Sequence, residues 1–112
     1  YIGLELAQSI YSIMLDNKAT GHTKNFNAEI ASVAKKDLKA GQKLDGEGGY
    51  CARGRLISSK KSKQERILPM GYTDNAVLKK DIKKDDFIFL DDVELNLPKQ
   101  IIEAREYQFN LI

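Results

Sequence analysis

The residues of this sequence that could bind a small molecule gather around one glycine-rich segment, residues 45–49. Tyr50 directly follows the segment, Arg53 lies three residues further on, and the charged pair Lys36 and Asp37 precedes it. An aromatic ring, a forked guanidinium donor and a charged pair can together hold a small polar substrate. We therefore predict that, if any residues of this chain contact a substrate, they are Lys36, Asp37, Tyr50 and Arg53.

Two arginines, Arg53 and Arg55, differ from the other cations because they lie in an apolar stretch rather than in a charge run. A strand would hold such an arginine so that its planar guanidinium faces a carboxylate. Structural ion pairs outnumber binding sites, so we favour an ion pair between Arg53 and Asp37 or Asp81, formed across the internal repeat. A substrate contact at Arg53 stays open as the alternative.

Glycine-rich segments can also bind phosphates, because their backbone N–H groups approach a ligand closely. The segment Asp45-Gly46-Glu47-Gly48-Gly49 lacks the G-x-G-x-x-G spacing of a dinucleotide site, and a strand-like stretch rather than a helix follows it. The pattern therefore favours a tight turn whose glycines adopt positive φ angles, with phosphate binding as the lesser alternative.

The remaining residues that could bind a metal or attack a substrate stand alone. His22 lies in a turn-rich stretch with no histidine, cysteine or carboxylate at the spacing of metal ligands. Cys51 lies in an apolar stretch without a visible base, which indicates a small buried side chain rather than a nucleophile. We therefore expect no metal site and no catalytic residue here.

Composition and charge disfavour several classes of protein. Of the 112 residues, 42% are hydrophobic and 30% charged, which is typical of one globular domain without a membrane span. Eighteen basic and sixteen acidic residues leave a net charge of +2, too little to favour nucleic acid. A single cysteine fits a reducing cytoplasm. The lysines that could form a basic patch are interleaved with aspartates: Lys35, Lys36, Lys79, Lys80, Lys83 and Lys84.

The first residues predict a helix whose apolar surface is too wide for a small domain to cover. From Gly3 to Leu15 the polar residues fall on one narrow stripe, namely Glu5, Gln8, Ser9 and Ser12. We therefore expect a missing neighbour, either another domain or a second subunit bound through residues 3–15. The alternative is a helix that packs on its own domain. Because the chain begins with Tyr1 and lacks a signal peptide, we expect it to be part of a longer protein.

Beyond a turn-rich connector, the sequence predicts a small β domain. Six short apolar runs of strand length and composition alternate with turn residues; they are residues 30–34, 42–44, 50–57, 67–70, 76–78 and 87–90. Residues 58–66 predict an exposed loop or a single helical turn. Pro98 precedes a short helix with a thin apolar stripe, formed by Ile101, Ala104, Tyr107 and Leu111.

An internal repeat organises the β domain. Residues 34–44 and 78–88 share the core Lys-Lys-Asp-[Leu/Ile]-Lys at a constant offset. Two copies suggest a pseudo-twofold pair packed against each other. In each copy we predict a strand that leads into a tight turn, with Asp37 or Asp81 accepting hydrogen bonds from the backbone that follows it.

Each copy also carries an apolar residue directly after its aspartate, Leu38 in the first and Ile82 in the second. We predict that these two side chains are buried in the hydrophobic core. Residues 40–41 and 84–85 then reverse the chain.

Several short motifs in a fixed order resemble the SAF domain, the β-clip module related to type III antifreeze proteins and found in sialic acid synthases and altronate dehydratases. The two segments that carry the resemblance are AKKDLKAGQKLDGEGGY and ILPMGYTDNAVLKKDIKKDDFIFLDDVEL. Asp85 departs from the family pattern, which usually places glycine there, and residues 58–66 carry little signal.

More narrowly, the order of motifs resembles the C-terminal end of homoserine-dehydrogenase-like NAD(P)-dependent oxidoreductases. That order is Gly3-Leu4-Glu5, Ala19-Thr20-Gly21, Gly48-Gly49-Tyr50, Leu68-Pro69-Met70-Gly71 and Asp91-Asp92-Val93-Glu94-Leu95. The resemblance implies a mainly β fold, a β-clip with a pseudo-twofold internal repeat, flanked by an N-terminal and a short C-terminal helix. Its expected divisions are residues 1–27, 28–95 and 96–112.

The resemblance also implies a function. This chain would be an accessory domain without catalytic or cofactor-binding residues, which aids subunit association or covers the substrate cleft. NAD or NADP would bind a Rossmann domain upstream of Tyr1. The alternative is a freestanding module whose β-clip surface binds a carbohydrate or a sugar acid.

Overall fold

The computed structural model describes residues 2–111, in which five short strands form two antiparallel sheets. Strands β1 (Ala28–Ala34) and β3 (Ala52–Ser58) form one sheet, and β2 (Lys43–Asp45), β4 (Asp74–Leu78) and β5 (Val93–Glu94) form the other in the order β2-β4-β5. Three α-helices accompany them, α1 (Ile2–Met14), α2 (Ser59–Glu65) and α3 (Lys99–Phe109). Because these helices hold more residues than the strands, the chain as a whole is not mainly β.

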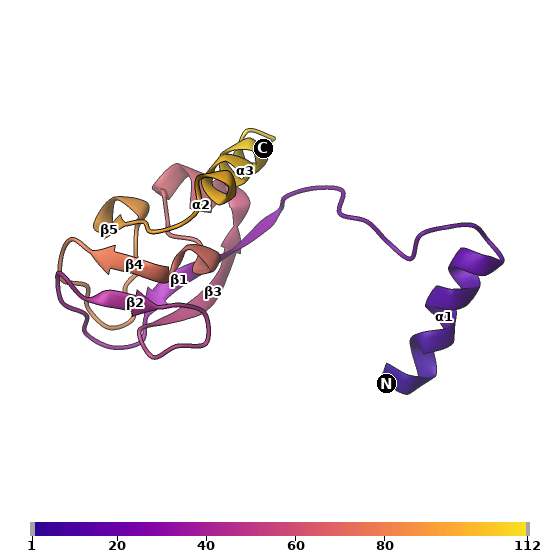
Figure 1. The fold of residues 1–112 in the computed structure, drawn as a ribbon, viewed down its shortest axis with the longest axis horizontal. Coiled ribbons are helices and arrows are strands. Elements are labelled where there is room, and N and C mark those ends of the chain that lie inside the picture. The colour runs from indigo at the N-terminus through magenta and orange to yellow at the C-terminus, as the bar shows by residue number, and fades with distance from the viewer. Residues whose placement is uncertain (1, 112) are drawn as a thin grey trace.

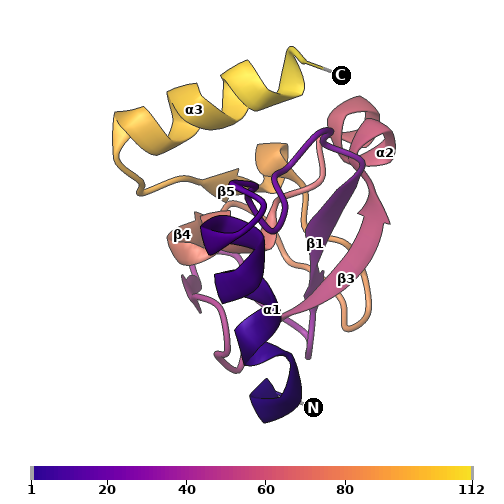
Figure 2. The same ribbon diagram turned by 90° about the vertical axis from the view of Figure 1, so that its right-hand side faces the viewer.

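The sheet of β1 and β3 is the longest regular feature, running from Ala28 opposite Ser58 to Ala34 opposite Ala52. Figure 2 shows it as a ribbon along one side of the β domain. Two of the predicted strands, residues 67–70 and 87–90, are wrong. They make only isolated bridges and pass into 3₁₀ turns at Met70–Tyr72 and Leu90–Asp92. In the first, Pro69 has no N–H to continue a ladder.

The core lies between the two sheets and is built from side chains of both repeats. Leu38 is 1% exposed and Ile82 is 6% exposed, which confirms that both plug the core. Around them pack other buried residues, including Leu44, Leu68, Leu78, Ile88 and Val93.

The two repeats lie against each other and exchange matched hydrogen bonds. Leu38 and Ile82 bond to each other in both directions, at 2.8 and 2.9 Å. The carboxylate of Asp37 accepts the N–H of Lys84, and that of Asp81 accepts the N–H of Ala40, each at 2.8 Å. The predicted bonds to the backbone of the same copy are therefore wrong, since each aspartate caps the turn of the other copy.

The two turns share one backbone conformation despite their different residues. Gly41 has a φ of 84° in the first copy, and Asp85 has a φ of 70° in the second. Aspartate tolerates this left-handed region better than most residues with a side chain. The departure at Asp85 therefore leaves the local turn intact.

Residues 58–66 contain the helix α2 (Ser59–Glu65), which is longer than the predicted single turn. Ser58 caps its start by accepting the N–H of Lys61, and Arg66 ends it with a φ of 52°. Ser59 and Ser62 are buried against the β domain. Two small polar side chains on one face let a lysine-rich segment pack closely.

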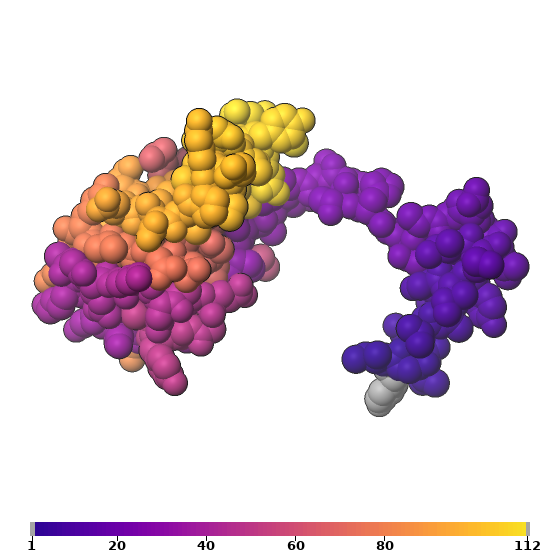
Figure 3. All heavy atoms as spheres, in the orientation of Figure 1, coloured from indigo at the N-terminus to yellow at the C-terminus, as the bar shows by residue number. Residues whose placement is uncertain are grey.

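The terminal helices begin near the predicted positions, and they differ in their contacts. Figures 1 and 3 show α1 set apart from the β domain by an extended connector, whereas α3 lies across the domain. No residue of α1 is buried. None of the helices within residues 2–111 is long and apolar enough to cross a membrane.

The predicted apolar stripe of α3 is displaced by about one residue. Ile101 is 46% exposed and Tyr107 is 69% exposed, whereas Ile102, Arg105 and Phe109 are half-buried. The helix turns this second face to the domain because Arg105 pairs there with Glu29 of β1.

Candidate functional site

The glycine-rich segment is a turn closed by the carboxylate of Asp45. Its two oxygens accept the N–H groups of Tyr50 at 2.6 Å and of Cys51 at 3.0 Å. These hydrogen bonds, with that from Tyr50 foremost, lower the pKa of Asp45 from 3.8 to about 2. Gly46 and Gly48 have φ angles of 80° and 79°, as the turn interpretation predicts.

Phosphate binding does not fit this turn, because Asp45 already takes the two amides that a phosphate would need. A side chain at Gly49 would place its Cβ 2.3 Å from the Asp45 Cγ. The glycine is therefore required by the carboxylate and leaves no cradle for a ligand. The segment fits neither nucleotide nor phosphate.

Cys51 has the small buried role that the sequence indicates. It is 4% exposed, and its sulfur accepts the side-chain amide of Gln42 at 3.5 Å. Burial raises the pKa of the thiol, so the nucleophilic thiolate is disfavoured. His22 is exposed in the connector, and residues 2–111 contain no cluster of three potential ligands for a metal.

Arg53 makes an ion pair, but with a different partner from those predicted. Its Nη2 lies 3.1 Å from Oδ1 of Asp85. Asp37 and Asp81 are engaged by backbone amides of the opposite repeat. The N–H of Asp85 bonds to the carbonyl of Ala34, the last residue of β1, at 2.9 Å, and the ion pair with Arg53 joins the same turn to the neighbouring strand β3.

The four predicted substrate residues divide into two places. Arg53 and Asp37 flank the same turn, since one pairs with Asp85 and the other accepts the N–H of Lys84. Tyr50 leaves the glycine-rich turn with 83% of its surface exposed. Within residues 2–111, no hydrogen bond or ion pair joins Lys36 or the Tyr50 ring to the other two.

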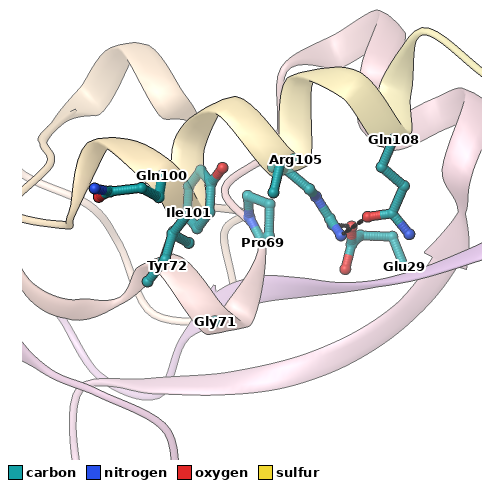
Figure 4. Close-up of a pocket in the computed structure, with 9 residues that line it drawn as sticks. Glu29, Pro69, Gly71, Tyr72, Gln100, Ile101, Arg105 and Gln108 are labelled. Carbon is teal, nitrogen blue, oxygen red and sulfur yellow. Dashed lines mark hydrogen bonds and ion pairs between the residues drawn. The ribbon is translucent and has the colours of Figure 1, made fainter.

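A cleft of about 450 Å³ lies beneath α3, and no pattern in the sequence predicted it. Figure 4 shows Pro69, Tyr72 and Ile101 along it, with a polar cluster at one end. In that cluster Arg105 pairs with Glu29 and donates a hydrogen bond to the side-chain oxygen of Gln108 at 2.8 Å. Glu29 is a charged residue within the otherwise uncharged strand 28–34, and this is the sequence signal that could have indicated its ion pair with Arg105.

Aromatic rings also hold the guanidinium of Arg105. Its Cζ lies 4.9 Å from the ring centre of Phe26 and 4.9 Å from that of Phe109. The two rings are themselves 5.6 Å apart and inclined at 52°. Burial lowers the pKa of Arg105, but an arginine keeps its charge at neutral pH. This arginine therefore fastens α3 to the start of β1.

Comparison with known families identifies the family of the β domain. The sequence model of the SAF domain matches residues 32–94, which is more than half of the chain. This chain belongs to the SAF domain family. A search of curated proteins found none that matches it.

The SAF segment contains the whole region around the glycine-rich turn but only part of the lining of the cleft beneath α3. Both repeats, the glycine-rich turn and the four predicted substrate residues lie within residues 32–94. Glu29, Phe26 and all of α3 lie outside this segment. The cleft beneath α3 is therefore formed between the SAF domain and helical or connecting segments added to it.

Proposed function

We propose that this chain is the C-terminal SAF-like accessory domain of an NAD(P)-dependent, homoserine-dehydrogenase-like oxidoreductase of the cytoplasm. In this role it contributes to subunit association or covers the substrate cleft, and it supplies no catalytic or cofactor-binding residue. NAD or NADP then binds the Rossmann domain upstream of Tyr1. The unsuitability of the glycine-rich turn for phosphate supports this division of labour.

The observation that carries the proposal is the exposure of α1. Its side chains Leu4, Leu6, Ile10, Ile13 and Met14 are 55–81% exposed. Burying one such side chain stabilises an assembly by about 1.5–3 kcal/mol. A helix of this kind in water favours association, and its place outside the SAF segment leaves it available to a host domain or to a second copy.

The matched contacts of the two repeats support the finer description of the fold. The exchange between Leu38 and Ile82, and the crossed caps of Asp37 and Asp81, are what a local twofold axis would produce. We infer that the SAF domain is a β-clip made of two such repeats.

The coding sequence upstream of Tyr1 tests the host. We expect it to encode a βαβ unit with a glycine fingerprint for a dinucleotide. The alternative, a freestanding module for a carbohydrate or sugar acid, is favoured by the exposed ring of Tyr50, since exposed aromatic rings can pack against ligands. An upstream sequence without a Rossmann unit would reject the oxidoreductase in favour of that module.

Kinetics of the full-length enzyme test the predicted substrate residues. Arg53→Ala should lower kcat/KM by about tenfold or more if the guanidinium contacts the reacting complex. Asp85→Asn is the matched control, because it removes the same ion pair and keeps the arginine. Equal kinetics of both variants and the wild type, with altered stability alone, would assign Arg53 a structural role.

A further inference from the structure

The outer edge of β3 carries backbone groups without partners. The bonds from the Lys35 N–H to the Cys51 carbonyl and from the Ser59 N–H to the Asn27 carbonyl, at 2.9 and 3.0 Å, mark the two ends of the ladder with β1. In an antiparallel pair, bonded and non-bonded residues alternate. Arg53, Arg55 and Ile57 therefore bond to β1, whereas the N–H and C=O of Gly54 and Leu56 point away from it.

This outer edge differs from the other edge of the same sheet. On the far side of β1, the N–H of Ser32 bonds to the carbonyl of Leu68, and its carbonyl accepts the N–H of Ile88. No residue among 2–111 bonds to the outward backbone groups of Gly54 or Leu56. Both residues are exposed, Leu56 to 69%, whereas Ala52 is covered. The accessible edge therefore runs from residue 54 to residue 58.

The side chains beside this edge present two different surfaces. On one face Ile30, 44% exposed, lies next to Leu56 across the ribbon. The other face is basic. There the guanidinium of Arg55 and the ammonium of Lys61 each lie 5.5 Å from the ring centre of Phe87. A strand added here would meet apolar side chains on one face and cations on the other.

A second copy of β3 is a poor occupant. Antiparallel pairing of two copies centred on Gly54 would place Arg53 opposite Arg55, and pairing centred on Arg55 would place the two Arg55 side chains face to face. Centred on Leu56, the two Arg55 side chains would still be diagonal neighbours. Like charges in these positions destabilise a pair of strands.

We propose that the edge of β3 from Gly54 to Ser58 binds an extended acidic segment of a partner protein as an added strand. An acidic residue of that segment lies over Arg55, and its alternate apolar residues lie over Ile30 and Leu56. Backbone hydrogen bonds to Gly54 and Leu56 fix its register. The proposal does not depend on the host enzyme.

The test uses the whole chain and a short peptide in which glutamate and valine alternate. We expect saturable binding, with hydrogen exchange at the amides of Gly54 and Leu56 slowed about tenfold. A peptide of alternating lysine and valine should bind at least about tenfold more weakly. Protection that maps elsewhere, or no binding of the acidic peptide, would overturn the proposal.

Three variants separate strand addition from simple charge attraction. Leu56→Pro removes an outward N–H without touching the ladder to β1, and it should abolish binding. Arg55→Glu should weaken binding about tenfold, whereas Lys43→Glu, at an exposed position of the other sheet, should leave it unchanged. An acidic peptide N-methylated at every residue should also fail, because neither of its edges then carries an N–H donor, and this holds even if Leu56→Pro does not fold. Binding of that peptide, or of a single-stranded oligonucleotide in place of the acidic peptide, would contradict strand addition.

Discussion

The two helices at the ends of the chain, α1 and α3, are attached in opposite ways. Helix α1 is rich in apolar residues, yet none of them is buried. Helix α3, KQIIEAREYQF, is mostly polar, yet it lies against the SAF domain, where Arg105 pairs with Glu29 and stacks on two phenylalanines. The ammonium of Lys63 adds a hydrogen bond to the carbonyl of Phe109 at 2.7 Å.

The apolar content of a helix and its attachment to a domain are therefore separate properties. Apolar side chains define how much surface should leave water, but the hydrophobic effect has no direction and names no partner. A guanidinium between a carboxylate and two rings does have a direction. Helix α3 is therefore held in place by Arg105, whereas no side chain of α1 is buried against the SAF domain.

The largest expected effect follows from breaking the apolar face of α1. We expect the 112-residue chain to form a dimer or larger assembly at micromolar concentration, because residues 3–15 of separate copies bury each other's apolar side chains. Ile10→Asp, or deletion of residues 1–16, should yield a monomer whose SAF domain stays folded. Sedimentation velocity with circular dichroism measures both. A wild-type chain that stays monomeric over this range would show that α1 folds back on its own domain.

A smaller effect should follow from removing the arginine that places α3. Arg105→Ala leaves Glu29 without its partner and should lower the free energy of unfolding by about 2 kcal/mol. This is less than for a fully buried pair, because Glu29 gains water once α3 leaves. Hydrogen exchange of the α3 amides should rise first.

Lys99→Ala is the matched control for Arg105→Ala. It breaks the Lys99–Glu103 pair within the same helix, where the Lys99 side chain is 85% exposed. Exposed pairs of this kind contribute about 0.3–0.5 kcal/mol. If both variants destabilised the chain equally, the docking of α3 would have to rest on its apolar face rather than on Arg105.

The smallest effect concerns Asp45 in the glycine-rich turn and how the stability of the SAF domain depends on pH. Because the pKa of Asp45 is about 2 when folded and 3.8 ordinarily, its stabilisation is fully present above pH 3.8 and is lost as the pH falls through 2. Urea unfolding should therefore show falling stability over this window. Asp45→Asn should be less stable at pH 5 and depend less on pH. An unchanged pH dependence in this variant would assign the acid sensitivity to other carboxylates.

The sequence was sufficient for features in which a residue acts on its own neighbours. It predicted the glycine-rich turn at 45–49 because positive φ is a local property of glycine. It predicted burial of Leu38 and Ile82 because a repeated apolar residue between charges has few other roles. It failed for the hydrogen-bond partners of Asp37 and Asp81. A carboxylate can accept an N–H from either turn, and the sequence does not show which turn lies within reach.

The candidate site was less predictable than the fold. Arg53 was placed correctly in a strand and in an ion pair, but its partner Asp85 lies beside it only after the two repeats pack. The cleft beneath α3 had no sequence pattern, because it forms between segments far apart in the chain. The open edge of β3 could be seen only once its pairing with β1 was known.

The sequence alone was enough to predict the two terminal helices, the glycine-rich turn, four of the strands and the apolar side chains that fill the core. These features depend on short-range sterics and on periodicity, which act within a few residues. That α1 binds a partner stays a prediction. The packed fold was needed to show that each repeat caps the turn of the other, which face α3 turns to the domain, and which edge of β3 stays open. Hydrogen bonds and ion pairs form between whichever groups come within about 3 Å, and packing alone sets those distances.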